Sequence, residues 1–146
     1  MESLNVKHEA IARLLDAFEI AINLYHEAKD DWTVAIAVWE AFRDSIIKRF
    51  ELSYDLLWKY LREYVGLSQG IYADSPRKVF DLCFQYGITN ADEGQLLFNM
   101  IKSRNLTTHT YDVDLANEMS EKVAEYYQVM HAIIVRTSPD TIKKVI

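Results

Sequence analysis

The sequence has few of the residues that break regular structure. Its 146 residues include four glycines and two prolines, about 4% of the chain, where average usage gives roughly 12%. Sandwiches and barrels of short strands need Gly and Pro turns every 8 to 12 residues or so, and disordered or collagen-like chains need far more of both. The scarcity excludes these classes and favours a mostly helical chain.

Cysteine pairs, a surplus of basic charge and long apolar runs are absent too. The single cysteine, Cys83, cannot form an internal disulfide, and 16 Lys and Arg against 22 Asp and Glu give a net charge of −6. This charge disfavours broad, sequence-independent binding to nucleic acid or to an anionic membrane. No apolar run approaches the roughly 18 to 20 residues of a membrane span, and no signal peptide is recognisable at the N-terminus. We expect a cytoplasmic protein that does not enter a membrane.

What the chain does contain is a supply of core residues, with 50% hydrophobic and 12% aromatic side chains. This composition suits one core, so we expect a single domain over residues 1–146. Residues 1–65 contain neither Gly nor Pro, and apolar side chains recur there every three to four positions. The spacing predicts a helix over about 4–28 and a second over about 32–64, capped by Asp31, with a loop from Gly66 to Asp74.

Helix-start signals divide the second half of the chain. Ser75-Pro76 is typical of a helix start and predicts a helix over about 76–86, ended by Gly87. A capping box at 90–93 begins a helix that runs into Arg104. A last long helix begins at Asp112 or Asp114, and residues 138–140 begin a short terminal helix. The predicted fold is all-α, an up-and-down four-helix-type bundle of about five helices plus a short C-terminal helix. The long second helix needs partners along its length, so we also expect a second copy of the chain.

The densest cluster of mixed polar residues lies at 101–112 and contains Arg104 and His109. Arg matches a phosphate with a fork of donors, and His suits proton transfer near neutral pH. On a regular helix Tyr111 shares a face with Arg104, whereas His109 is rotated about 140° away. If Arg104 and His109 act on one group, either the backbone at 105–108 leaves the α-helix or a second subunit contributes. The plainer alternative is a helix C-terminus with cations near its free carbonyls.

Two segments of the sequence match a known family. Residues 104–111, RNLTTHTY, match the R-x4-H-x-Y motif of HEPN (higher eukaryotes and prokaryotes nucleotide-binding) proteins. Residues 49–59, RFELSYDLLWK, resemble the RFEF(T/S)xxLxWK segment of the branch called nucleotidyltransferase substrate-binding proteins, as do Asn105 after Arg104 and the Ser75-Pro76-Arg77 start. The resemblance covers about residues 10–135.

This resemblance implies a small helical bundle that dimerises so that the motifs of two subunits approach each other. Members of the branch are usually encoded beside a minimal nucleotidyltransferase, and in several pairs the HEPN protein is the toxin, a metal-independent ribonuclease without a cofactor. By the same resemblance Arg104 and His109 are catalytic, Asn105 orients the phosphate or the imidazole, and Tyr111 accepts AMP from the nucleotidyltransferase. RNA is then the substrate, and the nucleotidyltransferase is the partner.

Other residues and functions stay open at this point. Glu51, Lys59 and Thr108 are weaker candidates for positioning substrate, since exposed helical charges are common. The histidines outside the motif lack a second ligand at metal-binding spacing, so we expect no metal site. Whether the chain is an enzyme is undecided: it is either the ribonuclease or a non-catalytic module that binds a nucleotidyltransferase and presents its substrate. A regulatory nucleotide-binding protein is a third candidate.

Overall fold

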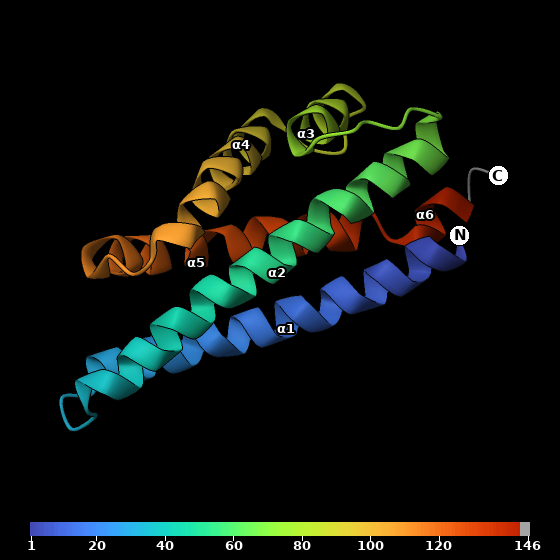
Figure 1. Cartoon of the computed structure of the whole chain (residues 1–146). Helices are drawn as coiled ribbons and strands as arrows, with labels where there is room; N and C mark the ends of the chain where they lie inside the picture. Colours follow the sequence, from blue (N-terminus) through green and yellow to red (C-terminus); the bar gives the residue numbers. More distant parts are fainter. Residues whose placement is uncertain (144–146) are drawn as a thin grey trace.

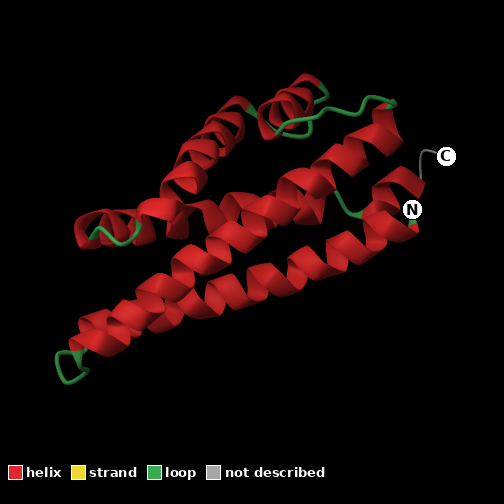
Figure 2. Ribbon diagram, viewed as in Figure 1, coloured by secondary structure: helices red, strands yellow, loops and turns green. Residues whose placement is uncertain are grey.

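The computed structural model describes residues 1–143, and all of its regular structure in that range is helical, as predicted. The elements in chain order are α1 (Glu2–Asp30), α2 (Ile36–Gln69), α3 (Pro76–Gln85), α4 (Ala91–Leu106), the 3₁₀ turn η1 (Thr107–His109), α5 (Val113–Arg136) and α6 (Pro139–Lys143). The helices α1 and α2 form a long antiparallel hairpin, and α5 packs against both of them (Figure 1). The shorter α3 packs against α2 and α4, α4 packs against α2 and α5, and short loops connect the helices (Figure 2).

The core lies where α1, α2 and α5 meet. Phe18 from α1, Phe50 from α2 and Tyr126 from α5 are almost completely buried, and the rings of Phe50 and Tyr126 lie 5.6 Å apart. Covering apolar faces of this kind supplies most of the stability of an amphipathic helix. Within the 49–59 segment, Tyr54 and Leu57 also belong to this core. The segment thus builds the scaffold on one face of α2 and leaves another face free for charged residues.

The predicted helix starts of the second half are confirmed by side-chain caps. The Ser75 hydroxyl accepts from the backbone N–H of Lys78 at 3.3 Å. Asn90 and Glu93 each accept from the other's backbone N–H, at 2.8 and 3.0 Å, and complete the predicted capping box. At the start of α5, Asp112 accepts from two backbone N–H groups of the first turn. Each cap satisfies donors that a helix N-terminus otherwise leaves unpaired.

The prediction for the start of the second helix was wrong. Asp31 does not cap a helix beginning at Trp32, because its carboxylate accepts from the backbone N–H and the hydroxyl of Thr33, at 2.9 and 2.6 Å. Such a local turn competes with helix formation. The helix therefore begins four residues later, at Ile36, and Trp32 lies in the loop with 93% of its surface exposed.

The predicted loop start at Gly66 was also wrong, because α2 continues through this residue to Gln69. The ring of Tyr72 packs against Gly66 so closely that a Cβ there would lie 2.1 Å from a ring carbon. The helix ends instead at Gly70, whose φ of 74° is the left-handed conformation that glycine adopts most readily. None of the helices in residues 1–143 combines the length and the apolarity that crossing a membrane requires.

Candidate functional site

The guanidinium of Arg104, near the end of α4, is bound by two carboxylates of α2. Arg104 Nε and Nη2 donate to the two oxygens of Asp55 at 3.0 and 3.1 Å, which is the bidentate geometry that Arg and carboxylate prefer. Arg104 Nη1 lies 3.6 Å from Glu51 Oε2. Glu51 and Asp55 are four residues apart, so they occupy one face of α2. The arginine is therefore held on two sides by negative charge.

The hydroxyl of Thr107 completes the surroundings of Arg104. It accepts from Arg104 Nη1 at 2.8 Å and donates to the backbone carbonyl of Arg104 at 2.7 Å. Because this hydroxyl occupies a carbonyl of the last helical turn, it also helps to end α4. The guanidinium of Arg104 thus has three polar side chains as partners in the described part of the chain, namely Asp55, Glu51 and Thr107.

The backbone leaves the α-helix within the motif, which is one of the two alternatives that the five-residue spacing left open. After Leu106 the chain forms the 3₁₀ turn of Thr107–His109 and then turns into α5. The hydroxyls of Thr108 and Thr110 each donate to the carbonyl three residues earlier, at 3.3 Å. These bonds satisfy carbonyls that the end of α4 leaves free. Threonines therefore build this corner without glycine or proline.

His109 and Tyr111 lie together on the exposed side of this corner. His109 Nδ1 is 3.4 Å from the Tyr111 hydroxyl, and the two rings meet edge to face with centroids 5.9 Å apart. Tyr111 is 83% exposed, which is unusual for a side chain that large. Most of its side chain is therefore in contact with solvent. Within one chain, the imidazole contacts this tyrosine and makes no hydrogen bond to Arg104.

The remaining predicted site residues lie around the Arg104 site. Asn105 and Thr108 are exposed, and the Asn105 carbonyl receives the Thr108 hydroxyl. Lys59 is exposed on α2, one turn beyond Asp55, and makes no ion pair within residues 1–143. Glu51 therefore joins the arginine site directly, whereas Lys59 lies beside it on the same helix face.

The sequence reasoning missed Asp55 and Thr107. Asp55 follows Glu51 by four residues, and that spacing places two carboxylates on one helix face. Grouping the charged residues of this helix by the face that they share would have identified Asp55 as a candidate. Thr107 carried no such signal, because its role depends on how the chain turns after α4.

Electrostatics at the site follow from these contacts. The hydrogen bonds from Arg104 to Asp55, together with the charges of Asp55 and Glu51, raise the pKa of the guanidinium. Burial and the neighbouring Asp55 charge raise the pKa of Tyr54 to about 12. Both groups keep their protons at neutral pH. Within residues 1–143 no group of three or more His, Cys, Asp and Glu side chains is arranged to hold a metal ion.

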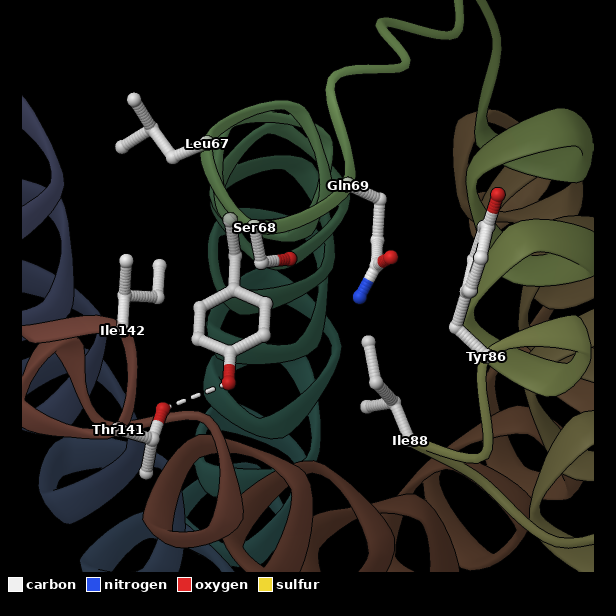
Figure 3. A pocket seen from close by; sticks show the side chains of 8 residues that line it. Leu67, Ser68, Gln69, Tyr86, Ile88, Thr141 and Ile142 are labelled. Carbon is white, nitrogen blue, oxygen red and sulfur yellow. Dashed lines mark hydrogen bonds between the residues drawn. The ribbon is translucent and has the colours of Figure 1, made fainter. Parts of the chain in front are cut away.

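A separate cavity of about 240 Å³ lies at the far end of α2 (Figure 3). Tyr64 and Tyr86 both line it, and the Tyr64 hydroxyl is 2.6 Å from that of Thr141. No charged side chain of the described residues lines it, and neither Arg104 nor His109 contributes to it. The polar chemistry of the motif is therefore at the α4–α5 corner and not in this cavity.

Comparisons with known proteins place the chain in a family. A crystal structure of a protein from Thermus thermophilus is similar, with a TM-score of 0.65 and 28% sequence identity over 82% of this chain and 98% of that one. No sequence match was found among curated proteins. Residues 6–138 match the family described as nucleotidyltransferase substrate binding protein like. This match covers most of the chain and includes both α2 carboxylates and the whole R-x4-H-x-Y motif. The chain therefore belongs to the nucleotidyltransferase substrate binding protein-like family.

Proposed function

We propose that this protein is a metal-independent ribonuclease, the toxin of a pair, and that a cognate minimal nucleotidyltransferase silences it. The observation that carries the proposal is the α4–α5 corner, where an oriented arginine, an exposed histidine and an exposed tyrosine occur within eight residues. The family supports an association with a nucleotidyltransferase. The corner supplies the phosphate-binding group and the proton carrier that RNA cleavage needs.

In the proposed reaction, His109 takes the proton of a ribose 2′-hydroxyl. The 2′-oxygen attacks the adjacent phosphorus, the bond from phosphorus to the 5′-oxygen breaks, and that oxygen leaves with a proton. Arg104 stabilises the negative charge that accumulates on the phosphoryl oxygens. To do so it exchanges part of its contact with Asp55 or Glu51 for the phosphate. In a dimer, the second subunit's motif provides the histidine that protonates the leaving oxygen.

Silencing in this proposal acts on Tyr111. Its hydroxyl gives its proton to a base and its oxygen attacks the α-phosphorus of ATP held by the nucleotidyltransferase. The bond from that phosphorus to the bridging oxygen breaks, the Tyr111 oxygen keeps AMP, and pyrophosphate leaves. The 83% exposure of Tyr111 supports access by a second enzyme. The adduct is bulky and negative, and the Tyr111 oxygen lies 3.4 Å from His109. It therefore blocks the histidine and competes with RNA for Arg104.

The test is His109→Ala, with His131→Ala as the matched control because His131 is exposed on α5 away from the motif. We expect expression of the wild type and of the control to slow growth, and the purified proteins to cleave RNA in the presence of EDTA. The His109→Ala variant is expected to do neither. Growth inhibition that survives in His109→Ala contradicts the proposal.

The tyrosine step has its own test. After co-expression with the nucleotidyltransferase, mass spectrometry of the peptide containing Tyr111 is expected to show a mass increase of one or more AMP units. Tyr111→Phe is expected to remain unmodified and toxic. An unmodified wild-type peptide from a non-toxic complex would mean that silencing occurs by binding alone.

A second candidate function is a non-catalytic partner subunit that binds a nucleotidyltransferase and presents its substrate. The observation that favours it is the neutralisation of Arg104 by Asp55 and Glu51 in a chain of net charge −6. Both features weaken the attraction for RNA phosphates. Purified protein that binds the nucleotidyltransferase and leaves RNA intact at every concentration would favour this candidate over the ribonuclease.

A further inference from the structure

The loop that joins α1 to α2 exposes a tryptophan on an ordered turn. Trp32 is 93% exposed, although tryptophan is one of the most costly side chains to leave in water. The turn around it is held by the two bonds from Thr33 to the Asp31 carboxylate and by Val34 N–H donating to the Asp31 carbonyl at 3.0 Å. An aromatic side chain on a fixed backbone loses little entropy when a partner covers it.

Next to this turn, the end of the hairpin is hollowed and apolar. A hollow of about 240 Å³ lies between α1 and α2 and is lined by Leu24, Glu27, Ala28, Asp31, Val34, Val38 and Phe42. Ile36, close to Trp32 in the chain, is 64% exposed. We call the apolar part of this region the hairpin tip, defined by Leu24, Trp32, Val34, Val38 and Phe42. Clustered exposed apolar side chains of this kind mark interaction surfaces.

Carboxylates surround the hairpin tip. Glu27 and Asp31 line the hollow, and Asp30 is exposed beside them. The hydrogen bonds from Thr33 lower the pKa of Asp31 and keep it ionised. The nearby cation, Lys29, is already bound to Glu121 of α5 at 3.0 Å. The rim of the hairpin tip is therefore anionic, which repels RNA and anionic lipid.

The charge also selects among protein partners. The hairpin tip of a second copy brings the same carboxylates, so tip-to-tip pairing places like charges together. A segment with apolar side chains flanked by lysine or arginine fits both the hollow and its rim. Such a segment buries Trp32 and pairs with Glu27 and Asp31.

We propose that the hairpin tip is the docking surface for the nucleotidyltransferase, which engages it through an apolar segment flanked by Lys or Arg. This inference rests on the proposed function, since that function requires the nucleotidyltransferase to bind this chain. It assigns recognition to the α1–α2 loop and chemistry to the α4–α5 corner. Trp32 is the expected anchor of the interface, because tryptophans at interface centres dominate binding energy.

The experiment measures the affinity of the full chain for the purified cognate nucleotidyltransferase by titration calorimetry. The variants are Trp32→Ala and Val38→Glu, and Val6→Glu is the matched control because Val6 is exposed at the opposite end of α1. We expect Kd to rise at least about tenfold for the two tip variants and to stay within about twofold for the control. Glu27→Lys is expected to weaken binding and to reduce its dependence on salt.

Each contrary outcome has a distinct meaning. If the nucleotidyltransferase binds the wild type and all variants equally, docking at the hairpin tip is wrong while the proposed function stands. If the nucleotidyltransferase does not bind the wild type, both the docking proposal and the proposed silencing are wrong. If sedimentation shows that Trp32→Ala lowers the mass of the free protein, the hairpin tip joins copies of this chain, and the inference is also overturned. Circular dichroism is expected to show unchanged folding, since Trp32 is almost fully exposed.

Discussion

Replacing Asp55 with asparagine separates two effects of this carboxylate on Arg104. Asp55 competes with an RNA phosphate for the guanidinium, and it also holds the guanidinium in one orientation. Asparagine keeps the size and one acceptor oxygen, but its amide N–H₂ faces a guanidinium that has only donors. The variant therefore loses one of the two hydrogen bonds, at 3.0 and 3.1 Å, and the attraction between the charges.

The size of the effect follows from the exposure of the pair. A hydrogen bond to a charged group contributes roughly 1.5–3 kcal/mol when shielded from water, and an exposed ion pair roughly 0.2–1. The Asp55 side chain is 42% exposed and that of Arg104 27%, so we discount the pair to about 1–2 kcal/mol. Releasing that competition tightens RNA binding by about 5- to 30-fold. Because the guanidinium is no longer fixed, kcat is expected to fall by about 10- to 100-fold.

The assay measures binding by fluorescence anisotropy with an RNA that carries 2′-deoxyribose at the cleaved position, and kcat by single-turnover cleavage of the matching RNA. Asp74→Asn is the control, because it changes the net charge equally, from −6 to −5, at an 80% exposed side chain that pairs with Lys78. If Asp55→Asn binds RNA no more tightly than Asp74→Asn, the idea that Asp55 competes with phosphate is refuted. If kcat is unchanged, Asp55 does not position Arg104.

Three further predictions concern stability. The buried Tyr60 hydroxyl donates to the Thr137 carbonyl, and Tyr60→Phe leaves that carbonyl without a partner. We expect this variant to lower the free energy of unfolding in urea by about 1–3 kcal/mol. Gly70→Ala is expected to destabilise the fold by about 1 kcal/mol, because φ is 74° there. Gly94→Ala, inside α4 with open space around it, is expected to stabilise the fold by about 0.5–1 kcal/mol in the same assay. The hydrogen bond from Arg136 lowers the pKa of Glu93, so this pair stabilises the fold above about pH 4.5 and its contribution disappears as pH falls further. Between pH 6 and pH 3, the Tm of the wild type is expected to fall more steeply than the Tm of Glu93→Gln.

Local signals predicted most of the fold, because they act within a few residues of the chain. Caps such as Asn90 and Asp112 bind the backbone of their own helix, and the apolar spacing identifies each buried face. The two errors arose where a more distant or competing contact decided the outcome. Gly66 leaves room for the Tyr72 ring within a helix that continues, and Asp31 forms a turn with Thr33 instead of a helix cap.

The site was predictable only in part, for a related reason. The motif contains Arg104 and His109, and helix geometry left two alternatives for bringing them to one group, a bend at 105–108 or a second subunit. The partners of Arg104 did not follow, because Asp55 is 49 residues away and reaches it only through the packing of α2 against α4. The exposed state of Tyr111 likewise depends on how the corner turns after Thr107. Contacts between distant segments therefore limit what the motif predicts.

The length of α2 sets how large a partner must be. Val38, in the hairpin tip, and Asp55, at the arginine, are 17 residues apart on this one helix, or about 25 Å at 1.5 Å per residue. A domain of about 100 residues has a radius of gyration of about 13 Å, so as a compact sphere it is about 34 Å wide, which exceeds that separation. A partner no larger than one small domain can therefore rest on the hairpin tip and still reach the arginine. An extended peptide needs about eight residues to span the same distance.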